Sequence, residues 1–155
     1  MMILTAKVSK SKLLLIALLI LAVILVLGLC LRNTDAPAPG TPERSTQAST
    51  NDQRVAYLRS YGWQVREEPV QTQEVSVPTE GSEVFLRYNA LQKSQGFDLT
   101  QLSGKTLKRY VYEICNYPGE GSYRATLLVW KNEIVGGDIC SDAAGGVMHG
   151  FQMPG

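Results

Sequence analysis

Residues 105–115 read KTLKRYVYEIC, and this stretch decides the fold. Its side chains alternate in character with a period of two, which is typical of a β-strand and not of a helix. One face carries Leu107, Arg109, Val111, Glu113 and Cys115, and the other carries Lys108, Tyr110, Tyr112 and Ile114. We expect the aromatic and aliphatic second face to be the one that packs against the core.

Two further strands follow this one along the chain. Residues 116–122 contain a proline and two glycines and predict a turn, after which residues 123–130 and 133–140 again have strand character. Only Lys131 and Asn132 separate the last two strands, which indicates a tight hairpin. The three strands are therefore predicted to form an antiparallel meander.

The segment before the meander predicts two helices. Asn51 or Asp52 is a suitable N-cap for a first helix, which ends at Gly62. Thr79 is a suitable cap for a second helix, which ends at Gly96. The apolar stripe expected to face the core from that second helix consists of Val84, Phe85, Tyr88 and Leu91.

Shorter elements lie between and after these helices. Alternation at residues 63–65 and 70–77 predicts two strands, and residues 97–104 predict a loop, with room for one helical turn, that buries Phe97, Leu99 and Leu102. The fold class that follows is α+β, with both helices packed on one face of a mainly antiparallel sheet.

The chain begins with an apolar segment of a different kind. Nineteen residues from Leu13 to Leu31 carry no charge, and at about 1.5 Å per residue they match the roughly 30 Å hydrocarbon core of a bilayer. Lys7, Lys10 and Lys12 precede the segment, so the N-terminus is predicted to be cytoplasmic and the C-terminal part extracytoplasmic in a single-pass protein of the cell membrane. The lipid bilayer would then be contacted through Leu13 to Leu31.

This segment has three other interpretations. A cleaved secretory signal would need a small-residue site near Ala36 and Ala38, where prolines intervene, and a lipoprotein signal would place its lipid on Cys30. A buried core helix would need burial on every side, which a domain of this size cannot provide. The predicted organisation is a basic leader (1–12), a transmembrane helix (13–31), a flexible linker (32–51) and an extracytoplasmic α+β domain (52–155).

Composition limits the functions that this chain can have. The chain has 155 residues, of which 45% are hydrophobic and 19% charged, which excludes a large multidomain enzyme. Beyond the membrane segment, twelve Lys and Arg stand against fourteen Asp and Glu. A domain that is not basic gives no support for nucleic-acid binding, which depends on neutralising phosphates.

Several short motifs together carry a resemblance to a known family. They are YLRSYGW at 57–63, YNALQK at 88–93 followed by QGFDL at 95–99, NYP at 116–118, and GGD at 136–138 with MHG at 148–150. With these motifs the chain resembles the uncharacterised membrane-anchored proteins of Firmicutes grouped as domain of unknown function 4830. Gly81 departs from the pattern, since similar proteins tend to carry a large aromatic residue there. The resemblance implies a bacterial source and this topology, and it implies no activity.

The densest group of chemically active side chains lies near the C-terminus. Cys140 and His149 are the candidates for a catalytic thiol and its base, which would make a thiol-dependent hydrolase or transferase. Asp138 and Asp142 are the candidate binding residues. The four side chains match no strong metal-ligand spacing, so neither a metal nor another cofactor is expected.

A disulfide between Cys115 and Cys140 is permitted in an oxidising compartment. In a simple meander, however, two inter-strand spacings separate the two cysteines, and this exceeds the Cα separation of about 7 Å that a disulfide spans. The bridge would form only if the strand order differed.

The residues favour a binding role over catalysis. We expect a non-catalytic interaction module of the bacterial cell envelope, whose partner is an envelope protein or a wall component. The alternatives are the thiol-dependent enzyme and an accessory subunit of a membrane complex whose helix makes the contact.

Overall fold

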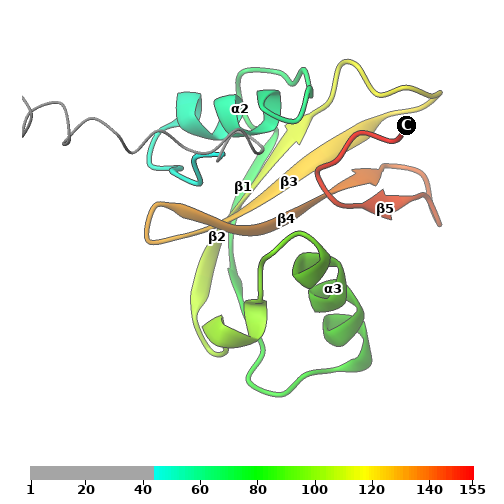
Figure 1. Ribbon diagram of the computed structural model, residues 1–155. Coiled ribbons are helices and arrows are strands. Elements are labelled where there is room, and N and C mark those ends of the chain that lie inside the picture. Colours follow the sequence, from blue (N-terminus) through cyan, green and yellow to red (C-terminus); the bar gives the residue numbers. More distant parts are fainter. Residues whose placement is uncertain (1–43) are drawn as a thin grey trace, which may run out of the picture. The chain divides into compact units, whose positions relative to one another are not determined.

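The computed structural model describes residues 44–155, which form an α+β domain (Figure 1). The elements in chain order are α2 (Asn51–Arg59), β1 (Gln71–Ser76), α3 (Glu83–Ser94), the short 3₁₀ helix η1 (Leu99–Leu102), β2 (Thr106–Glu113), β3 (Tyr123–Trp130), β4 (Glu133–Ser141) and β5 (Met148–His149). The predicted leader, transmembrane helix and most of the linker lie outside the described residues. Within residues 44–155 no helix is both long and apolar enough to cross a membrane.

The five strands form one antiparallel sheet in the order β1-β2-β3-β4-β5. The predicted meander of β2, β3 and β4 is confirmed, and β3 has the bounds that the sequence predicts. Lys131 and Asn132 form the hairpin between β3 and β4 with φ angles of 48° and 65°, the left-handed conformation that such a tight turn needs. The two-residue strand β5 was not predicted, because a strand this short leaves no alternation to read.

The folded domain begins earlier than residue 52. The backbone of residues 46–48 pairs with the start of β4: Ile134 N donates to the Thr46 carbonyl at 2.8 Å, and Ala48 N donates to the Asn132 carbonyl at 2.8 Å. Ala48 is buried. The end of the predicted linker therefore moves back from residue 51 to about residue 46.

The helix starts also differ from the predicted caps. Thr50, not Asn51 or Asp52, caps α2, in a reciprocal capping box with Gln53. Ser82, not Thr79, caps α3, and its hydroxyl accepts from Phe85 N at 3.2 Å. Gly81 consequently precedes the helix instead of lying inside it. The predicted strand at residues 63–65 is a single bridge between Val65 and Ile114.

The two helices lie on opposite faces of the sheet, so their predicted placement on one face is wrong (Figure 1). Helix α2 packs in one core cluster, which contains Leu127 and the rings of Trp63, Tyr112 and Phe151. The cluster on the α3 side contains Leu107 and Leu128. The sequence predicts that the strand face with Arg109 and Glu113 points away from the core. Leu107 and Val111 on that face are nevertheless only 1% and 2% exposed. A strand covered on both faces needs apolar residues in both alternating sets, and β2 has them.

Candidate functional site

The inner face of α3 is polar at its C-terminal end. Asn89 and Gln92 are its buried residues, whereas Val84, a member of the predicted apolar stripe, is 79% exposed. Gln92 Oε1 accepts from Gly137 N at 2.8 Å, and Asn89 Oδ1 accepts from Leu99 N at 2.8 Å. Buried amides are tolerated where they bond to backbone in this way. They fix the C-terminal end of α3 to β4 and η1.

Gln95 completes this attachment just beyond the end of α3. Its Nε2 donates to the Gly137 carbonyl at 3.0 Å, and its Oε1 accepts from Phe151 N at 2.7 Å. The glutamine side chains thus bond the backbone of β4 where β5 does not reach it. A Cβ on Gly136 would lie 2.9 Å from Gln92 Oε1, and one on Gly137 would overlap the Thr126 carbonyl oxygen. The glycine pair is therefore needed for close approach.

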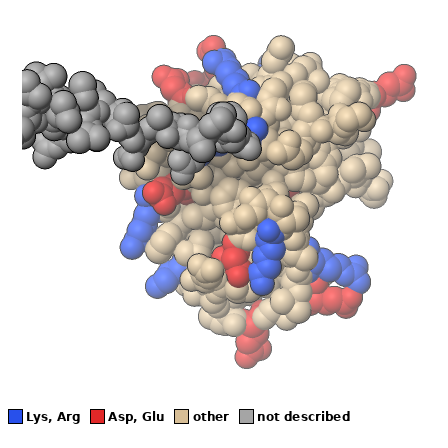
Figure 2. Space-filling model, viewed as in Figure 1, with Lys and Arg blue, Asp and Glu red and all other residues tan. Residues whose placement is uncertain are grey.

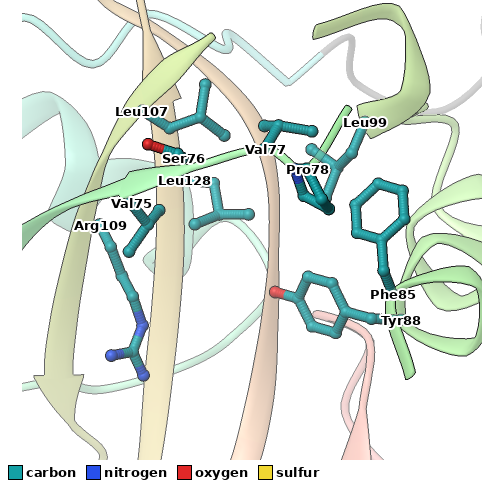
Figure 3. A pocket seen from close by; sticks show the side chains of 10 residues that line it. All are labelled: Val75, Ser76, Val77, Pro78, Phe85, Tyr88, Leu99, Leu107, Arg109 and Leu128. Atoms are coloured by element: carbon teal, nitrogen blue, oxygen red, sulfur yellow. The ribbon is translucent and has the colours of Figure 1, made fainter. Parts of the chain in front are cut away.

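A cavity of about 230 Å³ lies between the N-terminal half of α3 and the sheet (Figure 3). Phe85 and Tyr88 line it from the helix, and Leu107 and Leu128 line it from β2 and β3. The remaining lining residues are Val75, Ser76, Val77, Pro78, Leu99 and Arg109. Most of the wall is apolar. In Figure 3 the Arg109 guanidinium lies at the lower left edge of the cavity, across from the Tyr88 ring.

The size of the cavity limits what can occupy it. An engineered cavity of about 150 Å³ with aliphatic and aromatic walls is large enough for benzene, and pockets for drug-sized ligands begin near 300 Å³. The cavity of about 230 Å³ lies between these sizes. It has room for one aromatic ring with a short substituent or for a short branched chain.

A buried carboxyl group lies behind Tyr88. Asp138 is 4% exposed, and the Tyr88 hydroxyl donates to its Oδ1 at 2.7 Å. Burial raises the pKa of the Asp138 carboxyl, although the hydrogen bond from Tyr88 and the charge of Arg109 act in the opposite direction. Burial and the neighbouring Asp138 also raise the pKa of Tyr88, which keeps its hydroxyl protonated.

Arg109 is the only cation among the residues that line this cavity. It is half-buried, and within residues 44–155 its guanidinium forms no ion pair. Its strand partners on β1 and β3 are Gln73 and Leu128, which are both uncharged. The cavity therefore has one positively charged group with donor capacity left over.

Of the residues singled out in the sequence, Asp138 and Cys140 share the sheet face that α3 covers. They are two positions apart on β4, and Cys140 is half-buried. Burial, followed by the charge of Asp138, raises the pKa of the Cys140 thiol. A nucleophilic cysteine needs the opposite shift, because the thiolate is the reactive form.

His149 lies on the other face of the sheet. It pairs with Ile139 across β4 and β5, whereas Cys140 pairs with Met148. The His149 ring is 3.1 Å from the Tyr117 hydroxyl through Nε2, and its Nδ1 is 2.7 Å from the Gly150 carbonyl oxygen, to which it donates. Both ring nitrogens are thus occupied on the α2 side, and the structure does not bring Cys140 and His149 together.

The remaining candidate residues are Asp142 and the two cysteines. Asp142 forms an ion pair with Arg124 at 2.8 Å. Both Cys115 and Cys140 are free, and the strand partner of Cys140 is Arg124. In the part of the chain that the structure describes, no three His, Cys, Asp or Glu side chains are grouped to hold a metal ion.

The sequence pointed to Asp138 but not to the groups around it. Tyr88 was assigned to the core stripe of α3, and Arg109 to a strand face taken as solvent-exposed. One feature of the sequence does indicate the polar inner face of α3. Asn89 and Gln92 lie three positions apart, so they share one face of the helix, beside the predicted apolar stripe.

Acidic and basic side chains are interspersed on the face of the domain that Figure 2 shows. No extended patch of one sign is visible over the described residues of that face. The charge pattern of this face therefore does not single out a binding site, and the cavity under α3 is described by its apolar wall and its arginine.

The fold and the site together define a small α+β domain with a cavity of about 230 Å³ between a helix and an antiparallel sheet. The chain belongs to the family described as Domain of unknown function (DUF4830), whose model matches residues 57–139, more than half of the chain. All residues that line the cavity fall inside the matched range. No curated protein and no solved structure gives a significant match.

Proposed function

We propose that this protein is a non-catalytic ligand-binding module that takes a small, mainly apolar molecule into the cavity under α3. The observation that carries the proposal is the cavity itself, about 230 Å³ with an apolar wall. Small-molecule sites are typically concave and apolar, with a few polar groups that fix orientation. Arg109 and Tyr88 are those groups here.

The way α3 is attached supports this role. Hydrogen bonds from Asn89 and Gln92 hold its C-terminal end, whereas its N-terminal half contacts the sheet region through Phe85 and Tyr88 beside the cavity. The apolar side chains that line the cavity are only partly shielded from water, and burial of such surface is favourable. A ligand that fills the space buries part of that surface.

Catalysis has less support than binding. The raised pKa of Cys140 keeps its thiol protonated, and His149 bonds to groups on the opposite face. The Tyr88–Asp138 pair is internally satisfied. None of these groups forms the hydrogen-bonded nucleophile and base that acyl transfer requires.

We further propose that the domain works outside the bacterial cytoplasmic membrane. The support is the uncharged segment Leu13 to Leu31 with lysines before it, which favours a cytoplasmic N-terminus and an exported domain. Protease added to intact cells should then digest the domain. Protection of the domain in intact cells, with digestion only after lysis, would contradict this location.

Binding is tested on the full chain in lipid nanodiscs with benzamide, a neutral, water-soluble ring compound. Methyl NMR should show saturable shifts at Leu107 and Leu128, which line the cavity. Val75→Phe places a ring at the cavity wall and should abolish these shifts. Val70→Phe makes the same change at a residue that is 49% exposed and outside the lining, and it should leave them intact. Unsaturable shifts, or equal binding to both variants, would overturn the proposal.

A further inference from the structure

We infer that the natural ligand is a small monocarboxylate, whose apolar part fills the cavity under α3 and whose carboxylate binds the Arg109 guanidinium. This inference rests on the proposed binding function and adds the chemical class of the ligand. It depends on three observations: Arg109 has no ion-pair partner in residues 44–155, the Tyr88 hydroxyl donates to Asp138, and the cavity has a limited volume.

The surroundings of Arg109 leave its charge incompletely balanced. The half-buried side chain rises from β2 between Leu107 and Val111, which are both buried on the same face. A partly desolvated guanidinium is stabilised by a carboxylate, which it binds with two parallel hydrogen bonds. No acidic side chain of residues 44–155 supplies that partner within ion-pair distance.

The charged groups near Arg109 are few. Asp138 is close enough for the positive charge of Arg109 to lower the pKa of its carboxyl, but burial outweighs this effect. Arg124, on the same sheet face, is paired with Asp142, and Arg87, on α3, is paired with Glu83. A ligand carboxylate would therefore meet one unpaired cation and one competing acid.

Tyr88 does not compete for the carboxylate as a donor. Its single hydroxyl hydrogen is directed to Asp138 Oδ1, so toward a ligand it offers only its ring and an oxygen lone pair. Recognition of the anion thus falls to Arg109 alone. One guanidinium suits a single carboxylate, whereas a phosphate dianion is usually bound by several donors or cations.

The volume sets the size of the acid. The cavity of about 230 Å³ exceeds the space that benzene occupies in an engineered cavity and is too small for a long acyl chain or a peptide. An aromatic or short branched carboxylic acid meets both conditions. Benzoate is the simplest probe, and benzamide is its neutral counterpart of the same shape.

The experiment compares the two probes on the full chain in nanodiscs by methyl NMR titration. The wild-type protein should bind benzoate about tenfold more tightly than benzamide, since a charge-assisted hydrogen-bonded pair is worth roughly 1.5 kcal/mol or more. Arg109→Gln should lower the affinity for benzoate by a larger factor than the affinity for benzamide and so remove this preference. Arg109→Lys should retain part of it, because the charge remains without the planar fork.

Two further variants sharpen the result. Lys108→Gln removes a positive charge from the adjacent residue on the opposite face of β2 and should change neither affinity. Asp138→Asn keeps an acceptor for Tyr88 and cannot carry a negative charge, so benzoate should still bind more tightly than benzamide in this variant.

The outcomes separate the two proposals. Saturable binding of both probes with equal affinity in the wild-type protein, or an unchanged preference in Arg109→Gln, would overturn the carboxylate inference and leave the cavity as a binding site. If neither probe binds, the proposed function fails and the inference fails with it. The methyl spectrum of each variant without probe verifies that it is folded.

Discussion

The two faces of the sheet are built in different ways. On the α2 side, Trp63, Tyr112 and Phe151 are each 0% exposed, and Trp63 Nε1 donates to the Phe151 carbonyl at 2.6 Å. Rings fill the space there, with Tyr57 edge-on to Phe151 at a centroid separation of 5.3 Å. On the α3 side, amide hydrogen bonds hold one end of the helix and a cavity remains under the other end.

This difference shows which side is filled by side chains and which side has the space that the proposed ligand would occupy. A face filled by interlocking rings has little room to accept another molecule, because interiors are packed as densely as organic crystals. A helix attached by a few directed hydrogen bonds can stay in place while part of its apolar face lacks partners. The α2 side thus accounts for much of the stability, and the α3 side provides the space for a ligand.

The largest expected effect on stability is at Gly137 of β4, which lies against both Thr126 and Phe151. Gly137→Ala would drive a methyl group into the Thr126 carbonyl and the Phe151 ring at once. We expect a loss of more than about 3 kcal/mol in the free energy of unfolding, because backbone on one side cannot give way. Urea unfolding followed by circular dichroism measures this.

Gly145→Ala is the matched control. Gly145 has a φ of 72° and no atom within 4 Å of the added methyl group, so only backbone strain of about 1 kcal/mol is expected. Equal losses in the two variants would show that close approach at Gly137 is not what fixes β4 between the faces.

Truncation of a ring on each face is the next test of the comparison. Phe151→Ala should cost about 3–5 kcal/mol, as is usual for a fully buried phenylalanine. Phe85→Ala should cost about 1–2 kcal/mol, since its half-buried ring already borders empty space. Chemical denaturation of both variants decides the matter, and a larger loss for Phe85→Ala would reverse the assignment of the faces.

The pH dependence of stability should show the buried acid of the α3 side. Burial raises the folded-state pKa of Asp138 above its unfolded value of about 3.9, so the folded state retains a proton that the unfolded state has lost. The contribution of Asp138 to stability is therefore greatest below the unfolded pKa and is lost as the pH rises through the folded pKa. Asp138→Asn stays neutral and should gain stability relative to wild type as the pH rises from about 4 to about 7.

Asp98, also on the α3 side, should show the opposite dependence of stability on pH. Hydrogen bonds from Thr100 and Asn89 lower the pKa of its carboxyl, so its contribution is present above the unfolded pKa and is lost as the pH falls. Asp98→Asn should therefore lose stability relative to wild type as the pH rises from about 2 to about 5, and the difference should change little at higher pH. The same direction of change in both variants would contradict the environments assigned to the two acids.

The smallest effect on stability is expected at the partly exposed ion pair between Arg124 and Asp142. Arg124 and Asp142 form an ion pair at 2.8 Å, and their side chains are 43% and 36% exposed. Arg124→Gln should change the free energy of unfolding by less than about 1 kcal/mol, and less still in high salt. A larger, salt-insensitive loss in thermal unfolding would place Arg124 in the structural core of the α3 side.

Much of the fold could be predicted from local sequence pattern. Tyr123–Trp130 has the predicted bounds, and the turn at Lys131 and Asn132 is the predicted one, because alternation and turn chemistry act over a few residues. The face that each helix covers could not be predicted in the same way. On β2, Leu107 and Val111 alternate with Tyr110 and Tyr112, so both faces carry apolar residues and only tertiary packing assigns the helices.

The candidate site was predictable only in part. Asp138 was recognised as a polar residue in a glycine-rich segment, but its partner Tyr88 lies fifty positions away on α3. The cavity depends on how far α3 stands from the sheet, and that distance follows from the bonds of Gln92 and Gln95 to Gly137. Such long-range contacts leave no periodic signal in the sequence.

The central claim is that the α3 side contains an accessible apolar space against the sheet, whereas the ring cluster around Phe151 on the α2 side is filled. Xenon occupies such spaces without needing any polar partner, so a crystal of the protein pressurised with xenon tests the claim most directly. We predict one main peak of anomalous scattering enclosed by Val75, Phe85 and Leu128, and none in the cluster around Phe151. Absence of xenon under α3, or its presence among the rings of the α2 side, would contradict the account.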